Sequence, residues 1–143
     1  MNESKLDVKK RAVIEIAENL FLSQGLATTE MKEIARCASI SRSTLYRMFD
    51  SRETLAFAVA DKCLHELFDP KPMEIYGTDR SGFEILRSYS SNLIETMIQG
   101  VRHVKYLSEF DQMFSGDYPD TPEARKYVQF NRQRHDRQIL LNI

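Results

Sequence analysis

Thr29-Glu-Met-Lys-Glu-Ile-Ala-Arg-Cys-Ala-Ser-Ile-Ser-Arg-Ser-Thr-Leu-Tyr-Arg-Met-Phe49 is the stretch that decides the fold of this chain. Its apolar side chains recur at helical spacing in two short segments. Ile34 and Ala35 form the inner face of the first segment. Leu45 and Phe49 form the inner face of the second, whose outer face carries arginine and hydroxyl side chains. Two helices joined by a tight turn in this way are a helix-turn-helix, whose second helix enters the DNA major groove.

The outer face of the second segment supplies most of the expected DNA contacts. Arg42 and Ser43 lie in its first turn, from which side chains reach base edges, and arginine can bond guanine bidentately. Thr44, Tyr46 and Arg47 are expected to bind phosphates, which fix the register of the protein on DNA. For Tyr46 the alternative is that its ring packs against the first helix of the pair while its hydroxyl points outward.

The chain resembles the TetR family of bacterial transcriptional regulators. The resemblance runs without a gap from about Arg11 to Ala60 and includes Ala17-Glu-Asn-Leu-Phe21, Ser41-Arg-Ser-Thr-Leu-Tyr-Arg-Met-Phe49 and Ser51-Arg-Glu-Thr-Leu55. It implies that the helix capped by Asp50 or Ser51 meets a DNA phosphate through its N-terminus, with Arg52 in its first turn.

Two further positions in the motif carry expectations. Thr29 is a good N-cap for the first helix of the pair, and we place it among the DNA-contacting residues. Ser39 stands in the turn, where the family usually has glycine. Because glycine there relieves a left-handed backbone conformation, Ser39 is expected to bear a strain of about 1 kcal/mol.

The rest of the chain continues the helical pattern, so the expected fold class is all-α. A first helix is expected to end at Gly25, a long helix to reach Phe68, and later helices to cover about residues 83–98, 101–114 and 122–141. We divide the chain into a helix-turn-helix DNA-binding domain, residues 1–55, and a helical effector-binding and dimerisation domain, residues 56–143. The resemblance implies that the long helix joins the two.

The sequence ends in the apolar run Ile139-Leu-Leu-Asn-Ile143. TetR-family chains usually carry two further helices that pair two subunits as a four-helix bundle. We therefore expect the C-terminal part of the second domain to be missing from this sequence. The resemblance implies a homodimer, and the residues through which two copies would pair are left open.

The charge balance, the hydropathy and the cysteines of the sequence bear on its partners and its location. The 20 basic and 21 acidic residues nearly cancel, so a DNA-binding surface has to be a local feature. The sequence shows no signal peptide and no apolar run near the roughly 18 residues that suggest a membrane-spanning helix, so a cytoplasmic location without membrane contact is expected. Cys37 and Cys63 are expected to be buried free thiols.

Catalytic and metal-binding patterns are not found in the sequence. His65, His103 and His135 fall on three different predicted helices without metal-type spacing, so no metal and no other cofactor is expected. Phosphate-binding-loop, serine-hydrolase and zinc-protease motifs are absent, and the acidic residues are scattered along helix faces. The sequence therefore does not predict an enzyme.

The second domain is rich in large apolar residues, and the resemblance implies that some of them line a cavity for a small-molecule effector. The candidates are Tyr89, Met97, Tyr106, Phe110 and Tyr127. A place in the hydrophobic core is the alternative for each of them, because aromatic and methionine residues at helical spacing look the same in both cases.

The expected function is that of a sequence-specific transcriptional regulator. It would bind a double-stranded DNA operator as a homodimer and act as a repressor that a small-molecule effector releases. The alternative is a regulator-like interaction protein, which binds a partner protein or a ligand without gripping an operator. Binding to the DNA upstream of the gene discriminates between the two.

Overall fold

The computed structural model describes residues 4–68 and 80–140, and the side chains among these up to Arg134. These parts of the chain are helical, as predicted, and contain no strand. The helices are α1 Lys5–Gln24, α2 Met31–Cys37, α3 Arg42–Met48, α4 Arg52–Phe68, α5 Gly82–Gln99, α6 Val101–Phe114 and α7 Pro122–Leu140. The His135 side chain and the apolar run that ends at Ile143 lie outside the described side chains.

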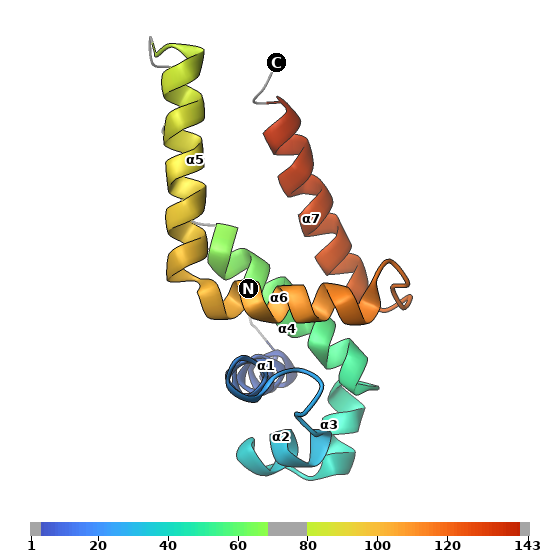
Figure 1. Cartoon of the computed structure of the whole chain (residues 1–143). Coiled ribbons are helices and arrows are strands. Elements are labelled where there is room, and N and C mark those ends of the chain that lie inside the picture. The colour runs from blue at the N-terminus through green and yellow to red at the C-terminus, as the bar shows by residue number, and fades with distance from the viewer. Residues whose placement is uncertain (1–3, 69–79, 141–143) are drawn as a thin grey trace.

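The first three helices form a head, and the long helix α4 leads from it into the rest of the chain (Figure 1). α4 packs against α1 in the head and against α6 and α7 beyond it. α6 also contacts α1, so the head and the body touch directly as well as through α4. α5 and α7 extend away from the head (Figure 1).

Hydroxyl side chains cap several of the helices. Ser41 Oγ accepts a hydrogen bond from the backbone N–H of Thr44 at 3.1 Å, which starts α3. Thr121 Oγ1 accepts one from the backbone N–H of Ala124 at 3.2 Å and starts α7, with Pro122 as its first residue. At the start of α4, Ser51 Oγ does the same for the Thr54 N–H at 3.1 Å.

The predicted capping role of Thr29 is wrong. Glu30 occupies the N-cap position of α2 and makes no side-chain capping bond. The Thr29 hydroxyl turns back and donates to the Gly25 carbonyl at 2.7 Å. Gly25 lies four residues before Thr29, so this hydrogen bond joins the two ends of the loop between α1 and α2.

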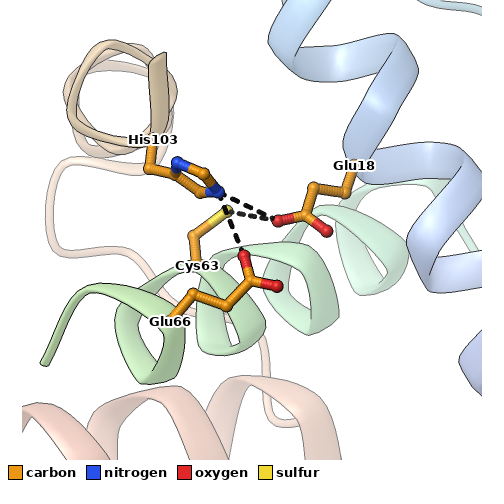
Figure 2. Close-up of side chains that lie close together, drawn as sticks. All are labelled: Glu18, Cys63, Glu66 and His103. Atoms are coloured by element: carbon orange, nitrogen blue, oxygen red, sulfur yellow. Dashed lines mark hydrogen bonds and ion pairs between the residues drawn. The ribbon is translucent and has the colours of Figure 1, made fainter. Parts of the chain in front are cut away.

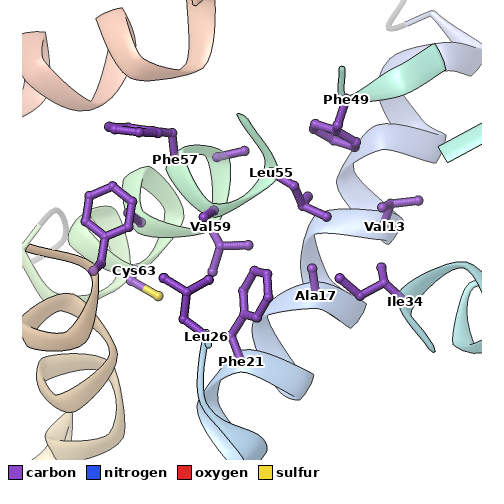
Figure 3. Packing of buried hydrophobic residues seen from close by; sticks show 14 of the residues in the cluster. Val13, Ala17, Phe21, Leu26, Ile34, Phe49, Leu55, Phe57, Val59 and Cys63 are labelled. Carbon is purple, nitrogen blue, oxygen red and sulfur yellow. The ribbon is translucent and has the colours of Figure 1, made fainter. Parts of the chain in front are cut away.

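The hydrophobic core of the head continues into the body (Figure 3). Phe21 of α1 and Ile34 of α2 are buried with Leu45 of α3, and Leu55 at the start of α4 lies in the same cluster. Further along α4, Phe57 meets the aromatic rings of α6 and α7. The arrangement fixes the direction in which the exposed face of α3 points.

The prediction of a buried free thiol is confirmed for Cys63 and wrong for Cys37, which is exposed. The inner face of α2 is formed by Met31, Ile34 and Ala35. Cys37 is the last residue of α2 and lies roughly 110° around the helix from the centre of that face. The apolar residues near it in the sequence therefore do not cover it.

The turn between α2 and α3 contains the strained residue that the sequence predicts. Ser39 is a non-glycine residue with a φ of 54°. This is the left-handed region, where Cβ of an L-residue comes too close to the following carbonyl oxygen. The turn keeps its helix-turn-helix geometry with serine in place of glycine.

Replacing Ser39 by glycine is expected to raise the free energy of unfolding by about 1 kcal/mol, because glycine adopts this backbone conformation without the steric cost. Urea unfolding followed by circular dichroism measures the change. Ser43→Gly is the matched control, since Ser43 lies in α3, where glycine is expected to lower stability by about 0.5 kcal/mol. A Ser39→Gly variant no more stable than the parent would contradict the strain.

No helix within the described ranges has both the length and the apolar composition needed to cross a membrane.

Candidate nucleic-acid interface

The exposed face of α3 is built from the residues that the sequence singles out. Arg42, Ser43 and Arg47 are exposed, and 46% of the Tyr46 side chain is accessible. Leu45 and Met48 are buried on the opposite face and anchor the helix to the core. The predicted outer and inner faces of this helix therefore match the structure.

Positive charge is concentrated on this helix although the chain as a whole has a net charge of −1. α3 contains the two arginines Arg42 and Arg47 and no acidic residue. A short, exposed, basic helix of this kind provides donors for phosphate oxygens and for guanine edges.

Thr44 has a local role that the sequence did not reveal. It is half-buried, and its hydroxyl lies 2.8 Å from Ser41 Oγ. Arg47 Nη2 donates to Thr44 Oγ1 at 3.5 Å, which holds the guanidinium along the helix. Thr44 thus supports the start of α3 and orients Arg47, in addition to any contact with a phosphate.

The other two predicted contacts lie off α3. Arg52 is half-buried at the start of α4, and its Nη1 donates to the Ala27 carbonyl at 3.4 Å. Thr29 is 0% exposed. Its hydroxyl is engaged with Gly25, so a contact of Thr29 with DNA would have to come from its backbone.

The loop between α1 and α2 is held by the body as well as by the head. Glu109 of α6 accepts a hydrogen bond from the Ala27 N–H at 3.1 Å. Nearby, the Tyr106 ring stacks on Phe21 with centroids 5.8 Å apart, and its hydroxyl donates to the Ala56 carbonyl at 2.8 Å. A shift of α6 would therefore also displace the residues of the head that it contacts.

Three of the five predicted effector residues lie close together, with the Phe110 ring 6.2 Å from that of Tyr106 and 5.1 Å from that of Tyr127. Tyr106, Phe110 and Tyr127 are buried in the core, and the Tyr127 hydroxyl donates to Asp111 Oδ1 at 3.2 Å. Met97 is 43% exposed on α5, and Tyr89 is half-buried on the same helix. Burial of the three aromatic residues on α6 and α7 agrees with the core alternative, and a role in effector binding stays a prediction for all five residues.

An open pocket of about 400 Å³ lies elsewhere, where α7 begins. It is lined by Tyr118, Pro119, Asp120, Ala124, Arg125, Val128, Gln129 and Arg132. None of the predicted effector residues is among them. The lining is partly charged and comes from the loop before α7 and from α7 itself.

A polar cluster at the junction of head and body is a second site that sequence reasoning missed. It contains Glu18 of α1, Cys63 and Glu66 of α4, and His103 of α6 (Figure 2). Burial raises the pKa of the Glu18 carboxyl above its ordinary value, and burial also raises the pKa of the Cys63 thiol well above its usual range. The four residues are spread over 86 positions of sequence, so no local spacing could have revealed them.

Known proteins match the head of the chain most closely. The family described as "Bacterial regulatory proteins, tetR family" matches residues 13–59. An uncharacterized HTH-type transcriptional regulator of Mycobacterium tuberculosis is 50% identical over 46 residues, which are 32% of this chain and 23% of that protein. An HTH-type transcriptional repressor of Rhodococcus jostii, KstR2, is 33% identical over 60 residues, 42% of this chain and 29% of the repressor.

Some of the similar proteins match beyond the head. The uncharacterized HTH-type transcriptional regulator YuxN of Bacillus subtilis is 29% identical over 139 residues, 94% of this chain and 45% of YuxN. The structure of the flavonoid-responsive regulator FrrA aligns with a TM-score of 0.59 at 28% identity, and covers 85% of this chain and 59% of FrrA. This chain therefore spans less than half the length of the three relatives compared by sequence.

Proposed function

We propose that this chain, which belongs to the TetR family of bacterial regulatory proteins, works as a sequence-specific DNA-binding transcriptional regulator that inserts α3 into the major groove of an operator. The observation that carries the proposal is the exposed face of α3. It presents Arg42, Ser43, Tyr46 and Arg47 to solvent while the opposite face is fixed in the core.

The roles of the exposed residues follow from their positions. Arg42 and Ser43 lie in the first turn of α3 and are assigned to base edges. Tyr46 and Arg47 lie one turn later and are assigned to phosphates, with Thr44 orienting the Arg47 guanidinium. Arg52 is assigned to a phosphate at the start of α4, next to the α1–α2 loop that it contacts.

A homodimer would place two such heads on one operator. Two copies of α3 would then enter successive major grooves about 34–36 Å apart, so the operator would be a pseudo-palindrome. In this proposal residues 1–55 form the DNA-binding domain and residues 56–143 the effector-binding and dimerisation domain. A protein with this role works in the cytoplasm, where the DNA is, and carries out no enzymatic reaction.

We further propose that the regulator is a repressor released by a small-molecule effector. The repressor of Rhodococcus jostii and the flavonoid-responsive FrrA support this role by similarity. The contacts from Glu109 to Ala27 and from Tyr106 to Phe21 give a body-bound ligand a physical route to the head. A ligand would act only through a difference in affinity between two head positions.

The complete product of the encoding gene, titrated onto the DNA upstream of that gene at several salt concentrations, tests the proposal. Tight, saturable binding that weakens with salt and exceeds binding to a scrambled fragment of the same length is the expected result. Equal, weak binding to both fragments would favour the alternative, in which the protein binds a partner without gripping an operator. Light scattering on the same sample gives the number of chains per complex.

Replacing Arg47 by alanine is expected to weaken binding to operator and scrambled DNA by about the same factor, because a phosphate contact carries no sequence information. The slope of log affinity against log salt is expected to fall by about 1 for each Arg47 lost from the interface. Fluorescence anisotropy at four or more salt concentrations measures both quantities. An unchanged slope would remove Arg47 from the phosphate contacts.

A further inference from the structure

Four side chains from three helices place their donor atoms together in the polar cluster of Glu18, Cys63, Glu66 and His103. One ligand atom of each lies within 4.8 Å of those of the others. His103 Nε2 lies 3.3 Å from Glu18 Oε1 and 3.0 Å from Glu66 Oε2. The Cys63 sulfur lies 3.6 Å from the same Glu18 Oε1, and Figure 2 shows all four side chains pointing toward one common region.

Two of these separations are those of a tetrahedral metal site. Zinc bonds of about 2.0 Å to nitrogen and oxygen and about 2.3 Å to sulfur place neighbouring ligand atoms about 3.3 Å apart, or about 3.5 Å when one is sulfur. The His103–Glu18 and Cys63–Glu18 distances match these edges within 0.1 Å. Thiolate, imidazole and carboxylate are the donor types that zinc selects.

The surroundings of the cluster fit a bound cation. Lys62 contacts both carboxylates, but through Glu18 Oε2 and Glu66 Oε1, the oxygens that do not face His103. Each carboxylate therefore keeps one oxygen for the cluster and is oriented through the other, as outer partners of metal ligands do. Two carboxylates and a thiolate balance the charges of a divalent cation and the Lys62 ammonium, so the loaded site would be neutral.

The cluster has a closed side and an open side. Glu18 and Cys63 are buried, whereas the side chains of Glu66 and His103 are 42% and 28% exposed. An ion could reach the site past Glu66 and His103 and settle against Glu18 and Cys63. If the cluster were only a salt bridge between Lys62 and the two carboxylates, it would need neither the thiol nor the imidazole.

We propose that Glu18, Cys63, Glu66 and His103 bind one divalent cation of the zinc type. On binding, the Cys63 thiol loses its proton to solvent and the sulfur forms the bond to the metal. The ion would tie α1 of the head to α4 and to α6 of the body. The proposal concerns metal binding alone and stands whether or not the chain binds DNA.

Titration of the metal-stripped chain with Co²⁺ tests the site, because cobalt takes the place of zinc and a thiolate–cobalt bond gives a charge-transfer absorption in the near ultraviolet. The wild-type chain is expected to develop this absorption to a limit of one cobalt per chain, and zinc is expected to abolish it. Cys63→Ser is expected to lose the absorption, whereas Cys37→Ser, which changes the exposed thiol of α2, is expected to keep it.

His103→Gln provides a variant on the open side of the site, so its fold is less at risk than that of a Cys63 variant. It is expected to lower zinc affinity by more than about 100-fold, since even outer partners of ligands contribute 10–100-fold. Zinc is expected to raise the thermal midpoint of the wild-type chain and not that of His103→Gln. His65→Gln, a histidine on α4 outside the cluster, is the control that keeps the zinc response.

A folded wild-type chain that gives no thiolate–cobalt absorption would overturn the proposal. So would an absorption that survives Cys63→Ser and disappears with Cys37→Ser, since the metal would then be bound by the surface thiol. A zinc response unchanged in His103→Gln would overturn the assignment of the histidine ligand. Circular dichroism of each variant confirms that the helices are present before the metal is added.

Discussion

Replacing Phe57 by alanine lowers the free energy of unfolding by about 3–5 kcal/mol, which is the largest effect of a single substitution expected in this chain. Phe57 is 0% exposed. Its ring lies 4.7 Å from that of Phe110 and 4.9 Å from that of Phe114 in α6, and 5.8 Å from that of Tyr127 in α7. The substitution removes a ring that all of these side chains pack against, and the rigid helices around it cannot close the cavity.

Urea unfolding measures this loss, with Leu86→Ala as the control. Leu86 is 60% exposed on α5, so truncation there is expected to change stability by no more than about 0.5 kcal/mol. A loss below about 1 kcal/mol for Phe57→Ala would show that α6 and α7 do not pack on α4 as described.

Replacing Arg42 by alanine is expected to weaken operator binding by about 1–3 kcal/mol more than it weakens binding to scrambled DNA. Arg42 is the first residue of α3, exposed, and held at the end of the helix that Ser41 caps. A guanidinium in this position can donate to both acceptors of a guanine, and a wrong base leaves those donors unpaired.

Competition titrations with operators carrying single base changes measure this loss of discrimination. For one base pair per half-site, the wild-type protein is expected to discriminate and Arg42→Ala is expected not to. Arg87→Ala controls for the loss of an arginine, because Arg87 is exposed on α5, away from the head. A uniform loss over all operators would make Arg42 a phosphate contact.

The helix-turn-helix was predictable from sequence because its determinants are local. Leu45 faces the core and Arg47 faces solvent because two positions along an α-helix correspond to a rotation of roughly 200° about its axis. Ser41 and Thr121 cap helices through bonds to residues three positions later in the chain. The positive φ of Ser39 was predictable from the resemblance, because the family usually has glycine at this position of the turn.

The features that the sequence missed depend on contacts between distant residues. Thr29 has the side chain of a good N-cap, but the Gly25 carbonyl competes for its hydroxyl once the loop closes. Tyr106 and Phe110 have the spacing of a ligand-binding face and are used to join α6 to α4 and α1. His103 has no metal-type neighbour in sequence, and its cluster forms only when α1, α4 and α6 pack together.

The central claim, that α3 lies in the DNA major groove with Arg42 at a base edge, is tested most directly by methylation protection of guanine N7, an atom of the major groove. The complete gene product bound to its upstream DNA is expected to protect guanines in two patches about one helical turn apart, and Arg42→Ala, at saturating protein, is expected to leave at least one guanine per patch unprotected. Full occupancy without protected guanines, or protection that Arg42→Ala leaves unchanged, would contradict the account.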